Sequence, residues 1–371
     1  MVEIMNSLEI LGEFAPQPCD EAHASAFAQA ALSPGTTLSL FPYNPAPLQP
    51  NELRIEVTHS GMCHSDVFMT TLGWGDNVMF PLVPGHEIAG VVTAMGDQVK
   101  GFDMGERVSF GVFRTACKKG TCEFCASGRE NLCPQREETY CPYFGGYSTS
   151  FQGRADFFTH IPAGILSEHA APLMCAGLTT FAPLNAYTRP GMKVGVQGLG
   201  GLGHLGVQFA AHMGCEVTAV STSASKAQLA TELGAQHFLN TSIEADKRKA
   251  RNALDLLLIT SSAYKISDYL DLVKPGGSVC VVGLPDIKAD LGVTMDFIIT
   301  GKKLIGSIVG SLGETRDMFN FCELHHIQPK VEIHAFDQAQ QAYDMLALGQ
   351  PRAPVFRNVL ETHSFLSTHR H

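Results

Sequence analysis

The stretch Val194-Gly195-Val196-Gln197-Gly198-Leu199-Gly200-Gly201-Leu202-Gly203 decides the fold of the second half of the chain. A short apolar strand pattern runs into a turn with the spacing G-x-G-x-x-G, and an apolar helix pattern follows over residues 205–213. This context favours a dinucleotide-binding turn. Gly198 permits the tight turn, Gly200 lets the backbone approach a pyrophosphate, and Gly203 allows the helix to pack closely on the strand. The N-terminus of that helix then faces the phosphates.

Strand and helix patterns alternate along the chain after residue 175. Strands are predicted at residues 216–220, 254–259 and 278–282, and a second helix at residues 226–233. This alternation predicts a parallel sheet with helices on both faces, the doubly wound architecture. We assign residues 176–313 to this dinucleotide-binding Rossmann domain.

The end of the second predicted strand bears on the choice of coenzyme. A carboxylate there would grip the ribose of NAD and repel a 2′-phosphate, and residues 219–226 contain none. Ser221 and Thr222 offer hydroxyl groups instead, and Lys226 offers a positive charge. We therefore expect a preference for NADP(H). The alternative is that Lys226 is a solvated helix lysine that makes no discrimination.

The chain before residue 175 reads as β-structure. Residues 52–58 alternate apolar and polar side chains, which is the period of a half-buried strand, and residues 88–93 and 107–110 read likewise. Frequent Gly and Pro residues punctuate these strands, as a compact barrel-like domain requires.

Three residues of this region offer ligands for a metal ion. Cys63 lies in Gly61-Met62-Cys63-His64-Ser65-Asp66, His86 lies in Gly85-His86-Glu87, and Cys175 lies in Met174-Cys175-Ala176-Gly177. Thiolate and imidazole are common zinc ligands, and three protein ligands with one open position are typical of a catalytic zinc. A lone buried cysteine is usually a small hydrophobic residue, so the prediction rests on the three residues together.

These motifs occur in the order found in the zinc-dependent medium-chain alcohol dehydrogenases. The sequence resembles in particular the cinnamyl alcohol dehydrogenase-like branch of that family, from near residue 26 to near residue 360. The resemblance implies an α/β protein in which a β-rich, GroES-like catalytic domain accompanies the doubly wound Rossmann domain. It assigns residues 1–175 to the catalytic domain, with an extension over residues 1–25. Residues 314–371 would form a return to that domain and a tail.

The resemblance also implies roles for neighbours of the metal ligands. Asp66 would orient His86, a contact that metal-bound histidines generally need. Glu87 would lie beside the metal and exchange with water as a fourth ligand. Ser65 is expected to hydrogen-bond the substrate oxygen and relay a proton; the alternative is an ordinary turn-capping serine.

Two further residues are assigned to the coenzyme in the same way, His64 as a contact of the phosphates and Thr179 as a coenzyme-binding residue. One departure from the family pattern concerns the proton relay. Many alcohol dehydrogenases carry a histidine five residues after the first ligand, where this chain has Phe68. The relay must therefore end at the nicotinamide ribose, at a water molecule or at another group.

A second cysteine cluster resembles the structural zinc lobe of the family and comprises Cys117, Cys122, Cys125 and Cys133. The first gap has four residues instead of the usual two, and Lys119 stands where the first cysteine normally falls. A gap of this length still suits a tetrahedral site. Cys141 is a spare candidate. We expect two zinc ions per chain.

Composition limits the remaining partners and the compartment. The net charge of −10 argues against a nucleic-acid partner, and no apolar run reaches the length of a membrane span. The acidic N-terminal segment does not read as a secretory signal. Eleven cysteines, four of them clustered as a metal site, indicate a soluble protein of the reducing cytosol.

Other segments support weaker expectations. Trp74 is equally a substrate-pocket residue or a core residue, and Phe68, Leu72 and Phe110 could add an apolar wall. Residues 303–310 resemble the edge strand through which the family forms homodimers, the alternative being an internal strand. Residues 1–25 are expected to be loose, with a short helix over residues 5–14 as the alternative. Residues 361–371 are expected to form no clear element.

The sequence thus predicts a zinc-dependent, NADP-dependent alcohol dehydrogenase or aldehyde reductase. Its substrate would be a small primary alcohol or aldehyde, aromatic or of medium aliphatic length. One alternative is a zinc polyol dehydrogenase, against which the third ligand Cys175 counts, because that pattern usually has a carboxylate there. The other is a non-catalytic NADP(H)-binding protein of the same fold.

Overall fold

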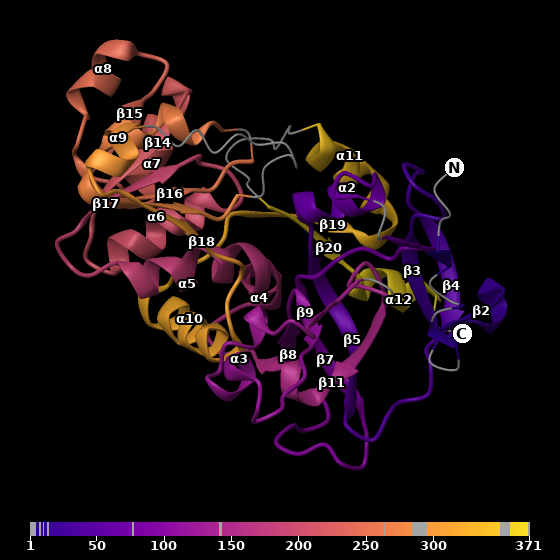
Figure 1. The fold of residues 1–371 in the computed structure, drawn as a ribbon. Helices are drawn as coiled ribbons and strands as arrows, with labels where there is room; N and C mark the ends of the chain where they lie inside the picture. Colours follow the sequence, from indigo (N-terminus) through magenta and orange to yellow (C-terminus); the bar gives the residue numbers. More distant parts are fainter. Residues whose placement is uncertain are drawn as a thin grey trace. The chain divides into compact units, whose positions relative to one another are not determined.

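The structure is a computed structural model that describes residues 5–6, 9, 11–12, 15–75, 78–140, 143–262, 264–283, 295–348 and 357–369. Its contacts divide the chain into two compact units (Figure 1). The first comprises Met1–Cys175, Ser311–Phe319 and Lys330–His371, and the second comprises Ala176–Gly310 and Asn320–Pro329. The chain thus re-enters the first unit at residue 311, earlier than the predicted residue 314. It leaves that unit again for residues 320–329, which the sequence patterns did not indicate.

The first unit is organised around a seven-stranded sheet in the order β12-β8-β7-β5-β20-β19, with β11 also paired to β5. Its strands are β5 (Glu52–Gly61), β7 (Ile88–Met95), β8 (Arg107–Phe110), β11 (Ser150–Arg154), β12 (Thr159–His160), β19 (Val331–Ala335) and β20 (Arg357–Glu361). The strands predicted at residues 52–58, 88–93 and 107–110 lie within β5, β7 and β8, so these three predictions are confirmed. Leu53, Ile55 and Val57 of β5 are fully buried, as their alternation predicts.

The N-terminal segment is more ordered than the sequence suggested. Strand β1 (Met5–Asn6) pairs in parallel with β6 (Met79–Phe80), and Leu11 and Ala15 are buried. The other short strands are β2 (Gln17–Pro18), β3 (Ala26–Ala30) and β4 (Ser39–Asn44) in one sheet, and β9 (Phe113–Thr115) and β10 (Glu137–Glu138) in another. The expectation of a loose extension is therefore wrong for these residues, because two apolar side chains of the segment are buried. Of the alternative helix over residues 5–14, residues 5–6 are strand, residues 9 and 11–12 are helical, and the others lie outside the described residues.

Short helices complete the first unit. They are α2 (His64–Thr70), α3 (Glu123–Ala126), α4 (Ser167–Pro172), α11 (Ala339–Ala347) and α12 (His363–His369), with the helical turns η2 (Glu21–His23), η3 (Glu130–Leu132), η4 (Ala155–Phe157) and η9 (Phe336–Gln338). The π-helix η5 (Leu173–Gly177) has residues in both units. Helix α12 corrects the expectation of a tail without structure. Its Phe365 ring packs against the rings of Phe27 and Phe336, with centroids 5.4 and 5.0 Å away.

The second unit contains a six-stranded parallel sheet in the order β15-β14-β13-β16-β17-β18. Its strands are β13 (Lys193–Gln197), β14 (Glu216–Ser221), β15 (His237–Asn240), β16 (Leu254–Ile259), β17 (Val273–Val281) and β18 (Lys303–Gly306). The chain runs outward from β13 and then returns to its other side at β16, so the strand order reverses between β13 and β16. Ligands of such sheets bind at the carboxyl ends of the strands beside this reversal.

Helices lie on both faces of this sheet (Figure 1). They are α5 (Leu178–Tyr187), α6 (Gly203–His212), α7 (Ala227–Glu232), α8 (Glu244–Lys249) and α9 (Met295–Ile299), with the turns η6 (Ala224–Lys226), η7 (Ile266–Asp268) and η8 (Leu270–Leu272). Helix α10 (Leu312–His325) has residues in both units. The predicted strands of this half and its two helices are confirmed. The predicted edge strand extends only over residues 303–306 and has one neighbour among the described strands.

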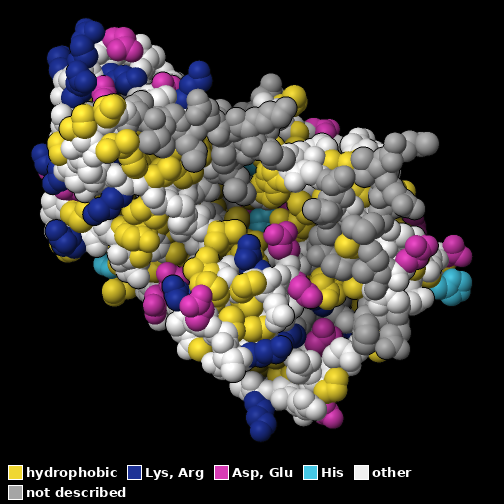
Figure 2. Space-filling view, viewed as in Figure 1, with side chains coloured by type: hydrophobic (Ala, Val, Ile, Leu, Met, Phe, Trp, Pro, Cys, Tyr) yellow, Lys and Arg dark blue, Asp and Glu magenta, His cyan; other side chains and the backbone are white. Residues whose placement is uncertain are grey.

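On the face shown in Figure 2, Lys and Arg side chains are scattered among Asp and Glu side chains, and a basic group gathers over α8. That helix also carries Glu244 and Asp246, and the Lys249 ammonium lies 3.8 Å from the Asp246 carboxylate. Among the described residues, no helix combines the length and the apolar character needed to cross a membrane.

Candidate metal centres and coenzyme turn

The first candidate metal centre unites residues that are far apart in the sequence. Cys63, His86, Glu87 and Cys175 each offer one ligand atom, and these atoms all lie within 4.8 Å of one another. All four side chains are buried. Cys63 is the N-cap of α2, His86 and Glu87 directly precede β7, and Cys175 lies in the π-helix η5.

Glycine at two positions allows this approach. A Cβ atom on Gly61 would come within 2.1 Å of Glu87 Oε2, so only glycine leaves room for that carboxylate. The Gly61 N–H donates to the Glu87 carbonyl at 2.8 Å and fixes the two segments together. Gly85 has φ +98°, in the left-handed region that favours glycine, and this turn directs His86 into the cluster.

The Asp66 carboxylate stands behind His86 and is fully buried. One oxygen, Oδ1, lies 3.2 Å from His86 Nδ1 and accepts the Gly85 N–H at 3.0 Å. The other, Oδ2, accepts the Cys63 N–H at 2.8 Å and the Tyr147 hydroxyl at 3.0 Å. Asp66 thus contacts both ligand-bearing segments. Tyr147 was missed by the sequence analysis, because nothing in its local sequence distinguishes it from a core tyrosine.

The electrostatics of this cluster suit a cation. Burial lowers the pKa of His86, but the Asp66 carboxylate and the Cys63 thiol outweigh that effect and raise it to about 10. A site that holds a proton so tightly is one in which negative charge is concentrated. Two thiols, an imidazole and a carboxylate are donors that zinc takes in tetrahedral sites, so the residues present fit a zinc ion.

The remaining predicted residues near the cluster are on or beside α2. Ser65 Oγ lies 3.5 Å from Cys63 Sγ, which puts a hydroxyl beside a candidate ligand. His64 is exposed, and its ring lies 5.6 Å from that of Phe68, which stacks on Trp74 at 5.1 Å. Trp74 is half-buried against a core cluster, a position that fits both interpretations given for it.

Phe110 does not line a pocket, contrary to the expectation of an apolar substrate wall. Its side chain has no exposed surface, and its ring packs between those of Phe151 and Phe158, with centroids 4.8 and 4.7 Å away. Strand β8 turns this position toward the interior, which a lone aromatic residue in a sequence does not reveal.

The second candidate metal centre consists of Cys117, Cys122, Cys125 and Cys133, whose sulfur atoms also lie within 4.8 Å of one another. Lys118 has φ +49°, and the Cys122 N–H donates to the Lys119 carbonyl at 3.0 Å. This tight turn absorbs the longer first gap, so Cys117 reaches Cys125 with 3.6 Å between the sulfur atoms. Cys141, the spare candidate, lies outside the described residues.

The glycine-rich turn of the second unit follows β13. Gly198 has φ +88° and its N–H donates to the Val220 carbonyl at 2.9 Å. A Cβ atom on Gly203 would lie 1.7 Å from the Gly198 carbonyl oxygen, whereas one on Gly200 would meet no described atom within 4 Å. Gly200 therefore borders open space at the carboxyl end of the sheet, where the helix α6 begins. The neighbouring motif residues are Gly201, half-buried, and Leu202, the N-cap of α6.

The other predicted coenzyme residues belong to the same unit. Ser221 ends β14 and accepts the Ser223 N–H on its Oγ at 3.2 Å, and Thr222 is exposed next to it. Lys226 Nζ donates to the Leu199 carbonyl at 3.1 Å, which holds the ammonium beside the glycine-rich turn. Burial lowers the pKa of Lys226. Thr179 lies in α5 and is buried.

Family models match both halves of the chain. Residues 49–163 match the alcohol dehydrogenase GroES-like domain, and residues 201–324 match the zinc-binding dehydrogenase domain. The probable formaldehyde dehydrogenase AdhA of Bacillus subtilis is 39% identical over 309 residues, 81% of this chain and 87% of the relative. The chain belongs to the zinc-dependent alcohol dehydrogenase family.

Further relatives of this dehydrogenase lie in the branch that the motifs indicated. Cinnamyl alcohol dehydrogenase 8 of Arabidopsis thaliana is 37% identical over 86% of the chain and 91% of the relative. Among solved structures, the Sorghum bicolor cinnamyl alcohol dehydrogenase SbCAD4 has a TM-score of 0.85 at 34% identity over 91% of this chain and 97% of that one. The Helicobacter pylori enzyme complexed with NADP(H) has a TM-score of 0.83 at 31% identity, with 91% and 97% covered. The resemblance and the fold class are confirmed.

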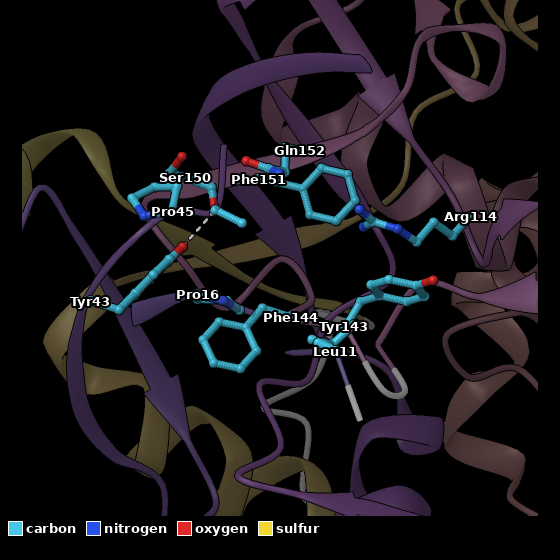
Figure 3. A pocket seen from close by; sticks show the side chains of 11 residues that line it. Leu11, Pro16, Tyr43, Pro45, Arg114, Tyr143, Phe144, Ser150, Phe151 and Gln152 are labelled. Atoms are coloured by element: carbon cyan, nitrogen blue, oxygen red, sulfur yellow. Dashed lines mark hydrogen bonds between the residues drawn. The ribbon is translucent and has the colours of Figure 1, made fainter. Parts of the chain in front are cut away.

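A cavity of about 40 Å³ in the first unit of the dehydrogenase lies apart from these residues (Figure 3). It is lined by Leu11, Pro16, Tyr43, Pro45, Ala46, Arg114, Tyr143, Phe144, Ser150, Phe151 and Gln152. The Arg114 guanidinium lies 4.1 Å from the Tyr143 ring and 3.6 Å from the Glu52 carboxylate. None of the predicted site residues lines this cavity.

Proposed function

We propose that this dehydrogenase interconverts primary alcohols and aldehydes with NADP(H), and that a catalytic zinc is held by Cys63, His86 and Cys175 with Glu87 beside it. The observation that carries the proposal is the buried set of four converging ligand atoms within 4.8 Å. Relatives named as cinnamyl alcohol dehydrogenases, an 8-hydroxygeraniol dehydrogenase and a vomilenine reductase support aromatic or medium aliphatic substrates.

The roles of the residues follow from their chemistry. When bound, zinc supplies a Lewis acid that polarises a carbonyl group, and NADPH supplies the hydride. Asp66 holds His86 in orientation, and burial of all four ligands excludes bulk water. Ser65, whose Oγ lies 3.5 Å from Cys63 Sγ, would donate its hydroxyl proton to the substrate oxygen and take one up in turn. His64 is proposed as a contact of the coenzyme phosphates.

The coenzyme residues are those around the glycine-rich turn. Gly198, Gly200 and Gly203 shape the turn, with Gly201 and Leu202 between them, and the N-terminus of α6 would offer N–H groups to the pyrophosphate. Thr179 of the same unit is proposed as a further coenzyme contact. The hydroxyl groups of Ser221 and Thr222 and the ammonium of Lys226 would bind the 2′-phosphate. The Helicobacter pylori relative complexed with NADP(H) supports this preference.

Nicotinamide absorbance tests the proposal directly. With an aromatic aldehyde such as cinnamaldehyde, we expect the absorbance of NADPH to decay much faster than that of NADH. Tight NADPH binding with no decay over a broad panel of aldehydes would instead support a non-catalytic binding protein. Absorbance decay only with keto sugars, or reduction of NADP+ only by polyols, would favour a polyol dehydrogenase.

Lys226→Glu tests the coenzyme preference. We expect the KM for NADPH to rise about tenfold or more, because a charge-assisted hydrogen bond contributes about 1.5–3 kcal/mol, while the KM for NADH changes little. Lys249→Glu is the matched control, since it reverses a charge on α8, where the Lys249 side chain is 80% exposed. An unchanged KM for NADPH in Lys226→Glu would remove this residue from the coenzyme site.

The other proposals concern the second zinc and the assembly. A structural zinc at Cys117, Cys122, Cys125 and Cys133 would pin the surrounding lobe without a part in the chemistry. A homodimer would form through β18 of two copies. The apolar side chains of Met295, Ile298 and Ile299 on the preceding helix α9 are more than two-thirds exposed and support an interface there. Sedimentation of a single 40.0 kDa species would contradict the dimer.

A further inference from the structure

The buried carboxylate of Asp66 accepts hydrogen bonds from groups other than the histidine that it would orient. Besides His86 Nδ1 at 3.2 Å, it receives two backbone N–H groups and the Tyr147 hydroxyl at 3.0 Å. The two N–H groups belong to the chain segments of the ligands themselves, Cys63 and Gly85. The tyrosine hydroxyl comes from a third segment and is the one side-chain donor to Oδ2 among these contacts.

The segment that carries Tyr147 is hydrogen-bonded to the loop that carries His86. The Gly145, Gly146 and Tyr147 N–H groups donate to the carbonyls of Val83, Gly85 and Pro84 at 2.9, 2.8 and 2.9 Å. A Cβ atom on Gly85 would lie 2.6 Å from Tyr147 Cδ1 and 2.8 Å from its backbone nitrogen. The glycine that turns the chain into His86 is therefore also the residue that lets the tyrosine ring approach.

Tyr147 keeps its proton in this environment. Burial raises the pKa of its hydroxyl well above the ordinary value, and the Asp66 carboxylate raises it further. A protonated hydroxyl donates to the carboxylate, so it fixes the plane of the Asp66 carboxylate, with one oxygen toward Tyr147 and the other toward His86.

We infer that Tyr147 is a positioning residue of the catalytic metal centre, whose hydroxyl locks Asp66 and thereby the orientation of His86 as a zinc ligand. The inference rests on the proposed function, since it requires a zinc ion at Cys63, His86 and Cys175. Loss of the hydroxyl leaves a fully buried carboxylate oxygen with one hydrogen-bond donor fewer. Because the carboxylate is buried, no solvent molecule replaces that donor. Partners of metal-bound histidines typically contribute 10–100-fold to metal affinity.

Release of zinc to a chromogenic chelator tests this role without recourse to turnover. The catalytic zinc is identified as the release phase that is missing in Cys63→Ser. In Tyr147→Phe we expect that phase to be about tenfold faster than in the unaltered chain. The second phase, from the cysteine cluster, should not change.

Tyr43→Phe is the matched control. Tyr43 is 3% exposed, and its hydroxyl bonds Ser148 Oγ at 2.6 Å and the Ser150 carbonyl at 2.9 Å, away from Asp66. Tyr43→Phe should lower the free energy of unfolding about as much as Tyr147→Phe does, while zinc is released at the rate of the unaltered chain. Equal release rates in the two phenylalanine variants would overturn the positioning role.

A double-mutant cycle with Asp66→Asn supplies a second criterion. If Tyr147 acts through Asp66, zinc release from the double variant should be no faster than from Asp66→Asn alone. Fully multiplicative effects would overturn the inference even if Tyr147→Phe proves unstable relative to its control. If no release phase is sensitive to Cys63→Ser, the proposed function itself is overturned, and the inference falls with it. This outcome differs from failure of the inference alone, in which the sensitive phase is present but Tyr147→Phe does not change it.

Discussion

Cys63→Ser is expected to remove one zinc ion per chain and to lower kcat/KM for aldehyde reduction by about a thousandfold or more. The reason is that zinc supplies several kcal/mol of charge stabilisation to the reaction, and each 1.4 kcal/mol is about a factor of ten. Serine lacks the soft thiolate, and its hydroxyl would have to lose a proton in a site where all four ligand residues are buried. Elemental analysis should give two zinc ions per chain before the change and one after it.

The control for this change is Cys215→Ser. Cys215 is 4% exposed, close to the 6% of Cys63, and lies outside both cysteine-containing metal groups. It should retain two zinc ions and full activity. Full activity in Cys63→Ser with two zinc ions still bound would end the assignment of the first centre, and one zinc ion in the unaltered chain would argue against the second.

Gly203→Ala is expected to lower the free energy of unfolding of the chain by about 3 kcal/mol or more, because overpacking of this kind costs about 1–3 kcal/mol even where side chains can yield. Here the added Cβ would lie 1.7 Å from the Gly198 carbonyl oxygen, which is backbone and cannot swing aside. Chemical denaturation of the full chain measures the loss, and NADPH affinity should fall with it.

Gly200→Ala separates the coenzyme role from the packing role. No described atom lies within 4 Å of a Cβ at this position, so stability should change by less than about 0.5 kcal/mol. The methyl group would instead stand where the pyrophosphate approaches, and we expect the Kd of NADPH to rise about tenfold, a loss of about 1.4 kcal/mol. Unchanged NADPH binding in this variant would show that the phosphates lie elsewhere.

Much of the fold was predictable because its signals are local. The alternation of residues 52–58 and the apolar strand before Gly198 each specify an element from a short window. The order of the metal-ligand and glycine-rich motifs along the chain then indicated which strands belong to the catalytic domain and which to the Rossmann domain. The termini escaped this reasoning, since the strand at Met5–Asn6 and the helix α12 depend on partners such as Met79 and Phe27 that no short window contains.

The candidate site divides in the same way. Cys63, His86 and Cys175 could be named from ligand type and spacing, and their convergence is a matter of geometry. Tyr147 could not be named, because it stands 81 residues from Asp66 and acquires its contact only through the folded loop. Phe110 shows the converse error, in which a residue of suitable type is turned into the core.

The position of β20 in the main sheet affects how the protein matures. Val359 pairs with Gly61 and Leu360 with Ser60, so the strand that leads to Cys63 has a neighbour that is synthesised after all four candidate ligand residues. Chains fold from their N-terminal parts during synthesis, and pairings between distant residues form slowly. Until residues 357–361 have been synthesised, the end of β5 next to Gly61 therefore has no β20 partner. We expect the segment that carries Cys63 to be fixed only after β20 has paired, so that zinc would enter the first candidate centre after this pairing.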